Sequence, residues 1–173
     1  MWRFRPFMPL GPNESPVTLG EGDTPLLSCP RLGALLGIED LWVKDEAANP
    51  TGSFKARGLS AAVTRAVAAG VTRFVIPTAG NAGVSAAAYA ARAGAAVRVY
   101  APRTTPKAIL AQIVTFGAEL TLLDGHIGDC GKAARAWAGI LMSKLPSAWA
   151  ILNVITKNVS NWNTISIIGV MSM

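Results

Sequence analysis

The sequence predicts an α/β protein with an open parallel sheet and flanking helices, and three observations predict this class. Between residues 73 and 138, short β-branched or aromatic runs alternate with Ala-rich segments of helical length. Gly94 and Gly117 stand where two of these helices should end. Half of the chain, 51%, is hydrophobic and only 15% is charged, which favours a buried core over disorder. Strand–helix units of this length build parallel sheets with right-handed crossovers.

The first part of the chain predicts a less regular arrangement, because Pro, Gly and polar residues are frequent there. We expect, in chain order, an irregular N-terminal segment (1–25), a short helix (31–37), a short strand (41–44), a turn (49–53) and a helix (53–69). Gly37 closes the first helix. Ser53 ends the turn, and its hydroxyl can cap the helix that follows.

The alternation that follows predicts a βαβαβ core within residues 58–137. Three parallel strands are expected near 73–77, 96–101 and 119–123. The expected helices are 81–93, 106–116 and 128–138, and Pro106 suits the start of the second.

The chain changes character after about Trp137. Residues 138–173 contain no acidic residue and show neither clean helical nor clean strand periodicity. We therefore expect this tail to be foreign to the domain before it, as if read from beyond a break or out of frame.

The net charge of +6 does not indicate a nucleic-acid surface. Residues 1–129 hold 12 basic and 10 acidic residues, a net of +2, and residues 130–173 hold four basic residues, the other +4. No basic cluster forms, although phosphate-backbone binding needs several cations on one face. We expect no nucleic-acid partner.

Cys29 and Cys130 lack CxxC spacing, so we expect reduced thiols and no metal site, with a disulfide as the alternative. The lone His126 is expected to be structural or solvent-facing. Polar residues interrupt every window long enough for a membrane span, and no signal peptide is recognisable. We expect a soluble, cytoplasmic protein with no membrane contact.

One candidate site is Lys55, in the segment Asn-Pro-Thr-Gly-Ser-Phe-Lys that begins at Asn49. A lysine just inside a helix N-terminus lies near the positive end of the helix dipole. That position favours the neutral amine, the form needed for Schiff-base chemistry. The alternative is a helix-surface lysine beside an ordinary cap.

A second candidate site is Thr-Ala-Gly-Asn-Ala-Gly, which runs from Thr78 to Gly83 between a strand end and a helix start. Small residues here let backbone N–H groups approach an anion, at the sheet edge where α/β proteins bind ligands. Asn81 adds a side-chain amide. The alternative is a plain turn in which Asn81 caps the helix.

Together these motifs resemble those of fold-type-II pyridoxal-phosphate (PLP) enzymes, the tryptophan synthase beta-like family, and within it the threonine synthase branch. Gly22-Asp-Thr-Pro-Leu26 resembles an early segment of that family, and Lys44-Asp-Glu46 resembles the strand before its lysine. The resemblance covers roughly residues 17–137.

The resemblance implies roles for individual residues. Lys55 would bind the PLP aldehyde covalently and shuttle protons, while the Asn81 side chain would hydrogen-bond the ring hydroxyl. Thr78, Gly80 and Ala82 would help hold the carboxylate of an amino-acid substrate. We expect three further residues to line the site: Thr24, Lys44 and Ser85.

The implied reaction converts O-phosphohomoserine and water to threonine and phosphate. Two departures bear on it. Ala56 follows the lysine where many relatives have Asp, and only Gly139 and Gly169 follow Gly131, so the family's Gly-rich phosphate loop has no counterpart. We therefore expect a truncated, impaired enzyme. A threonine dehydratase-like lyase and a non-catalytic fragment are the alternatives.

The implied organisation is an incomplete large domain over 1–57, a small open α/β domain over 58–137, and the unmatched tail over 138–173. An incomplete domain leaves apolar surface uncovered, so self-association is expected.

Overall fold

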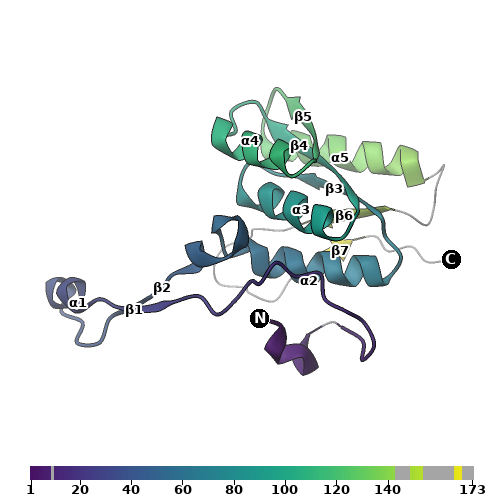
Figure 1. The fold of residues 1–173 in the computed structure, drawn as a ribbon. Coiled ribbons are helices and arrows are strands. Elements are labelled where there is room, and N and C mark those ends of the chain that lie inside the picture. Colours follow the sequence, from purple (N-terminus) through teal and green to yellow (C-terminus); the bar gives the residue numbers. More distant parts are fainter. Residues whose placement is uncertain (9, 143–148, 154–165, 169–173) are drawn as a thin grey trace.

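The computed structural model describes residues 1–8, 10–142, 149–153 and 166–168 (Figure 1). The elements, in chain order and with η marking a 3-10 helix, are η1 (Trp2–Phe7), β1 (Leu26–Ser28), α1 (Pro30–Leu36), β2 (Trp42–Lys44), η2 (Glu46–Ala48), η3 (Pro50–Gly52), α2 (Lys55–Ala68), β3 (Arg73–Pro77), α3 (Asn81–Arg92), β4 (Ala96–Pro102), α4 (Lys107–Thr115), β5 (Glu119–Leu123), α5 (Ile127–Met142), β6 (Trp149–Asn153) and β7 (Ser166–Ile168).

The predicted parallel core is confirmed. The main sheet has the strand order β5-β4-β3-β6-β7, and β3, β4 and β5 are mutually parallel. The register aligns Phe74 with Val97, and Val99 with Leu120. The intervening helices α3 and α4 are the crossovers that parallel pairing requires.

The sheet also contains two strands that the sequence did not predict. β6 pairs with β3 in parallel, and β7 pairs antiparallel with β6. Both come from the segment after residue 137, which shows no clean alternation of polar and apolar residues. β6 lies between β3 and β7, and an internal strand of this kind commonly has a continuous apolar sequence, so periodicity alone does not reveal it.

The sheet is covered on both faces, as Figure 1 shows for α3 and α5. Phe74 and Ile76 of β3 pack in one core cluster with residues of α2 and α3, whereas Val75 packs in a second cluster with Cys130 and Ala134 of α5. This alternation along β3 is the two-residue period of a strand with two buried faces. The Ala-rich sequences of α2 and α3 let these two helices pack closely.

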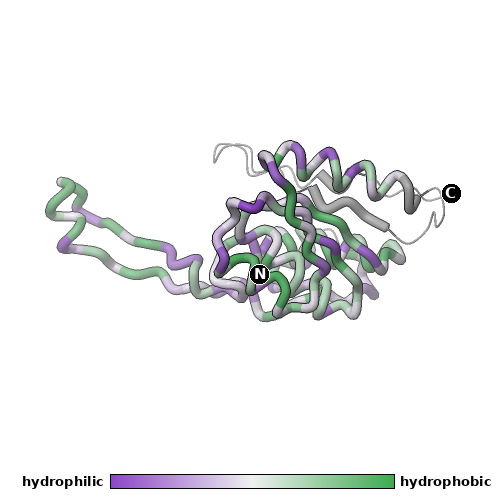
Figure 2. The backbone as a smooth tube through the Cα atoms, turned by 90° about the horizontal axis from the view of Figure 1, so that it is seen from above, coloured by the Kyte–Doolittle hydropathy of each residue, from purple (hydrophilic) through white to green (hydrophobic). Residues whose placement is uncertain are grey.

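An arm made of β1, α1 and β2 extends away from the body (Figures 1 and 2). β1 and β2 form a separate antiparallel two-stranded sheet, with Leu27 opposite Val43. Eight large apolar side chains of the arm are exposed, namely Leu26, Leu27, Leu32, Leu35, Leu36, Ile38, Trp42 and Val43. An isolated two-stranded ribbon is only marginally stable by itself. An exposed apolar surface of this kind commonly marks a site of interaction.

The segment before β1 is held on the body by the buried carboxylate of Glu21, which is 3% exposed. It accepts hydrogen bonds from Ser60 Oγ of α2, from Tyr89 Oη of α3 at 2.6 Å and from Trp2 Nε1 at 2.7 Å. Burial alone would raise the pKa of Glu21, but the hydrogen bonds from Ser60, Tyr89 and the Leu19 N–H lower it further than burial raises it. The carboxylate therefore joins three segments as an anion.

Two further sequence expectations can be compared with the structure. Cys29 and Cys130 are free thiols, and Cys130 is buried. In the described ranges, no helix has both the length and the apolar character needed to cross a membrane.

Candidate functional site

Lys55 is the first residue of α2, so the predicted position at a helix N-terminus is confirmed. The helix begins two residues later than expected. Ser53 nevertheless contributes as a cap does, because its hydroxyl accepts the backbone N–H of Lys55 at 3.2 Å. The Lys55 side chain is half-buried, and this burial lowers the pKa of its amine. The Nζ atom lies 4.6 Å from the centroid of the Phe54 ring.

The turn before Lys55 has an unusual backbone. Thr51 has φ 66° and ψ 14°, in the left-handed region, and Gly52 follows with φ 65°. Glycine adopts this conformation without cost, but for a β-branched residue it is a genuine outlier. Such residues cost on the order of 1–3 kcal/mol and persist only where neighbouring contacts hold them.

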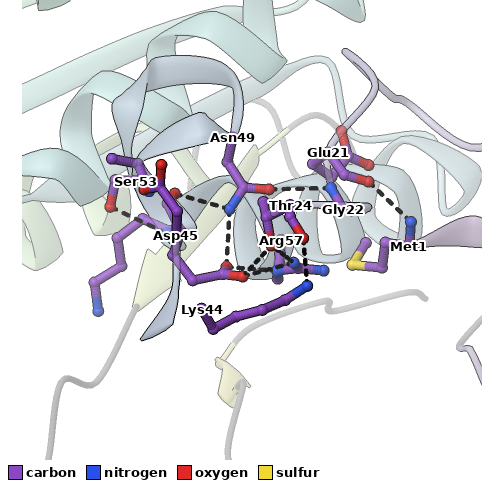
Figure 3. Close-up of polar contacts among 12 residues, drawn as sticks. Met1, Glu21, Gly22, Thr24, Lys44, Asp45, Asn49, Ser53 and Arg57 are labelled. Carbon is purple, nitrogen blue, oxygen red and sulfur yellow. Dashed lines mark hydrogen bonds and ion pairs between the residues drawn. The ribbon is translucent and has the colours of Figure 1, made fainter. Parts of the chain in front are cut away.

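Hydrogen bonds from neighbouring elements frame this turn (Figure 3). The Asn49 amide donates to Glu46 Oε2 at 2.8 Å, and its oxygen accepts the Gly22 N–H at 3.0 Å. Glu46 in turn binds Arg57 of α2 through two contacts, at 2.7 and 2.8 Å. This two-point ion pair joins a residue before the turn to a residue after Lys55, and so links the two ends of the segment that carries the lysine.

We expect stability to fall in acid through Glu46. Its hydrogen bonds from Arg57 outweigh burial and lower the pKa to about 2, from an ordinary value of 4.5. The folded state therefore binds fewer protons than the unfolded state between these values, so stability present above about pH 5 is lost as the pH falls toward 2. Urea unfolding between pH 7 and 3 should show a loss of about 1–3 kcal/mol, discounted for partial exposure. Glu46→Gln should flatten this dependence, and an unchanged pH profile in that variant would contradict the assignment.

The second motif forms the loop between β3 and α3. Asn81 is the first residue of α3, as predicted, but it does not cap the helix. The Thr78 hydroxyl instead accepts the N–H groups of Gly80 and Gly83, at 3.2 and 3.1 Å. Asn81 is exposed, and its amide has no hydrogen-bond partner among the described residues. The interpretation of Asn81 as an N-cap was therefore wrong.

The two glycines of this loop differ in whether the surrounding structure leaves room for a side chain. A Cβ on Gly83 would lie 2.3 Å from Thr78 Cγ2, so the packing of the loop excludes any side chain there. A Cβ on Gly80 would meet nothing within 4 Å, and its φ of −172° is open to any residue. The fold therefore explains Gly83 and leaves Gly80 beside open space.

We expect Gly83→Ala to destabilise the protein by about 1–3 kcal/mol, the usual cost of overpacking a tight site. Gly80→Ala is the matched control, and its free energy of unfolding should stay within about 0.5 kcal/mol of the original protein. Chemical denaturation of both variants measures this difference. Equal effects of the two substitutions would show that the Thr78 contact does not constrain the loop.

A contact between two hydroxyl groups joins the two motifs. Thr51 Oγ1 lies 2.8 Å from Ser85 Oγ, which is fully buried in α3. The turn before Lys55 is thereby fixed to the helix that begins at Asn81. Sequence analysis expected Ser85 near the site but missed its partner, because nothing in the sequence marks Thr51 as left-handed beside Gly52.

The other expected residues are placed as follows. Gly80 is the N-cap of α3, and Ala82 is its second residue. Thr24 donates to Glu46 Oε1 at 2.7 Å, and Lys44 donates to the backbone oxygen of Thr24 (Figure 3). Thr24 and Lys44 thus belong to the network around Glu46. Sequence analysis missed Arg57, although its position two residues after Lys55 and the acid at Glu46 were a usable signal.

The fold and the two loops that carry the motifs define a class of protein, and comparison with known proteins agrees with that class. Residues 17–169 match the family described as pyridoxal-phosphate dependent enzyme, and the chain belongs to that family. This match extends past residue 137, where the recognised motifs end. The family's cofactor is PLP.

Within the family, threonine synthases are among the curated relatives that the chain matches. The chain is 44% identical to the threonine synthase of Mycobacterium leprae over 136 residues, which are 78% of this chain and 38% of that protein. It is 41% identical to the threonine synthase of Methanocaldococcus jannaschii over 130 residues, 75% of this chain and 32% of that protein. The chain thus spans about a third of the length of these relatives. Within the family, it is of the threonine synthase type.

Solved structures show the same fold. O-ureido-L-serine synthase superimposes with a TM-score of 0.64 at 28% identity, over 80% of this chain and 44% of that one. Diaminopropionate ammonia lyase from Escherichia coli has a TM-score of 0.69 at 20% identity, over 83% of this chain and 44% of that one. These neighbours confirm the predicted fold class.

The chemistry of the two motifs fits the ring and aldehyde end of PLP. Lys55 supplies a half-buried amine with a lowered pKa, and Asn81 supplies an exposed amide. The first N–H groups of α3 have no acceptor within the helix, and Thr78 takes only those of Gly80 and Gly83. The N–H groups of Asn81 and Ala82 are therefore available to an anion, beside the open space at Gly80.

Proposed function

We propose that this chain carries the lysine-bearing part of a threonine synthase-like enzyme that converts O-phosphohomoserine and water to threonine and phosphate. The observation that carries the proposal is the joining of the two motifs, because the Lys55 turn and the Asn81 helix share the Thr51–Ser85 contact. Identity of 37–44% to threonine synthases supports the substrate. The substrate itself is a small amino acid.

In this proposal PLP, when bound, supplies an electron sink for carbanion chemistry. Lys55 provides the neutral amine that binds the cofactor and moves the proton at the substrate's reacting carbon. The lowered pKa of Lys55 raises the fraction of neutral amine at a given pH. The Asn81 amide donates to the cofactor's ring hydroxyl.

The loop from Thr78 to Ala82 binds the substrate carboxylate. Its N–H donors lie at the positive end of α3, which favours an anion. The contribution of Thr78 is to hold the loop, since its hydroxyl is engaged with Gly80 and Gly83. Gly80 leaves the space that the carboxylate occupies.

The experiment is an assay with two substrates. With O-phosphohomoserine and PLP, phosphate release that disappears in Lys55→Ala supports the synthase reaction. Threonine converted to a 2-oxo acid by the same lysine would instead indicate the dehydratase. Product formed equally by Lys55→Ala would exclude both.

We further propose that the chain on its own is an impaired enzyme. It spans 32–38% of the length of threonine synthases that it matches. After Gly131 it has only Gly139 and Gly169, too few for a Gly-rich phosphate loop. The division into an incomplete large domain (1–57), a small domain (58–137) and a tail (138–173) stays a prediction.

We also propose that the arm pairs with the arm of a second copy. Its eight exposed apolar residues and unpaired strand edges favour strand addition. Residues 25–44 contain two bases, Arg31 and Lys44, and two acids, Glu39 and Asp40, so the arm is neutral in a chain of charge +6. Contact between two neutral arms therefore adds no net charge repulsion of its own.

Sedimentation velocity should show concentration-dependent association that the double substitution Leu35→Gln/Leu36→Gln weakens by about tenfold or more, since each buried leucine contributes roughly 1.5–3 kcal/mol. Phe7→Gln is the matched control, because Phe7 is 88% exposed but lies outside the arm. A monomer at all concentrations, or equal loss in both variants, would contradict arm pairing.

A further inference from the structure

In the described part of the chain, the hydroxyl contact between Thr51 and Ser85 is the one direct hydrogen bond between the side chains of the Lys55 turn and those of α3. Thr51 stands at the apex of the turn, four residues before Lys55. Ser85 stands four residues after Asn81, hence on the same face of α3 as Asn81. The contact therefore connects the two elements that carry the proposed site.

The turn needs this contact because its backbone is strained. Thr51 is held in the left-handed region, where a β-branched residue is disfavoured by roughly 1–2 kcal/mol. At the start of the turn, Asn49 is fixed by Glu46 and Gly22, and its carbonyl accepts the Gly52 N–H at 3.0 Å. At the apex, the hydroxyl of Ser85 is what opposes relaxation of Thr51.

Ser85 is also well suited to this role by its burial. It is 0% exposed in an otherwise Ala-rich helix segment. A buried hydroxyl without a partner costs about 1–3 kcal/mol. Separating the pair is therefore unfavourable for Ser85 as well as for Thr51. A shift of the Thr51 apex is passed on to Lys55, because Ser53, between them, accepts the Lys55 N–H.

We propose that Thr51 and Ser85 are positioning residues, whose hydroxyl pair locks the 49–53 turn and thereby sets the place of the Lys55 amine relative to the Asn81 helix. This inference rests on the proposed function for its purpose. Its geometry concerns only this chain's own residues. Neither hydroxyl needs to touch cofactor or substrate.

The first readout requires no cofactor. Limited acetylation at a series of pH values, followed by peptide mass spectrometry, gives the pH midpoint for each lysine amine. In the original protein Lys55 should react with a lowered midpoint, because burial lowers the pKa of its amine. In Thr51→Val and Ser85→Ala the Lys55 midpoint should rise, because the released turn exposes the amine to water.

The second readout is the rate at which PLP is fixed to Lys55 by borohydride reduction. It should fall about tenfold in Thr51→Val and Ser85→Ala, as expected when a reacting group is misplaced by a fraction of an ångström. Thr51→Ser keeps the hydroxyl and should stay within about twofold of the original protein. That rescue separates the hydroxyl from mere occupancy of the turn.

Two variants guard against an effect of stability alone. Ser60→Ala also removes a fully buried hydroxyl, the one bound to Glu21, and should destabilise the protein without moving the Lys55 midpoint. Thr51→Gly accepts the left-handed backbone without strain and so folds even if Thr51→Val does not. It also lacks the hydroxyl that ties the turn to α3, and the wider backbone freedom of glycine lets the untied turn move, so the proposal predicts a raised Lys55 midpoint.

The outcomes separate the two proposals. Unchanged midpoints and fixation rates in Thr51→Gly and Ser85→Ala would overturn the positioning role, as would an equal shift in Ser60→Ala. If the midpoints shift as expected but the original protein fixes no PLP at Lys55, the positioning geometry stands and the proposed function fails.

Discussion

Glu21→Ala is expected to lower the free energy of unfolding by about 2–4 kcal/mol, the largest stability effect that the structure predicts, because hydrogen bonds to a charged group contribute about 1.5–3 kcal/mol each. The substitution removes the acceptor for buried or partly buried donors on three segments: Trp2 in η1, Ser60 in α2 and Tyr89 in α3. Trp2 Nε1 and Ser60 Oγ would retain acceptors, at Ser60 Oγ and the Val17 carbonyl. The buried Tyr89 hydroxyl would keep none among the described residues, and a buried donor left in this way costs roughly 1–3 kcal/mol. The segment before β1 should therefore detach from the helices as the body loses stability.

Urea unfolding measures this loss, and limited proteolysis within residues 1–25 reports the detachment. Glu21→Gln is the matched control, because it keeps the shape and one acceptor oxygen but loses the charge, and it should cost distinctly less. A loss below about 1 kcal/mol in Glu21→Ala would mean that the carboxylate does not join the segments.

The second large effect concerns affinity for PLP. On the proposal that the chain lacks the phosphate loop, it should bind PLP at least about 10²-fold more weakly than a full-length threonine synthase. Two or more charge-assisted hydrogen bonds to the phosphate would then be absent, each worth about 1.5–3 kcal/mol. Absorbance titration with PLP measures the dissociation constant. Slow or absent turnover of O-phosphohomoserine should accompany it.

A cofactor analogue isolates the phosphate contribution. 5′-Deoxypyridoxal keeps the aldehyde and ring but lacks the phosphate. Without a phosphate cradle, the chain should bind it and PLP with dissociation constants within about threefold of each other. A 100-fold preference for PLP would show that this chain, or its second copy, supplies a cradle after all.

Much of the fold followed from local patterns. The strands β3, β4 and β5 and the helices between them came from alternation of strand and helix signals, with Gly94 and Gly117 at helix ends. Those signals are local and mutually consistent. β6 could not be predicted this way, because its place beside β3 is set by the sheet and by no pattern of its own.

The positions of the two motifs could be predicted from the sequence, but most of the contacts that hold them in place could not. The positions of Lys55 and Asn81 at helix starts were predicted because the turn and helix-start signals beside them are local. The partners of Thr51 and Glu21 are far away in sequence, at Ser85, Ser60 and Tyr89. The alternative in which Asn81 caps α3 considered that residue alone, whereas the Gly83 N–H of the helix is accepted by the Thr78 hydroxyl from outside it.

The central claim is that Lys55 is the lysine that binds PLP, and one measurement tests it most directly. The full chain is mixed with PLP, reduced with borohydride and digested, and the pyridoxyl group is located by peptide mass spectrometry. The account predicts that the group lies mainly on Lys55 and that Lys55→Ala reduces the total to background. A label spread over the other lysines, such as Lys44, Lys107 and Lys132, or an equal amount on Lys55→Ala, would contradict it.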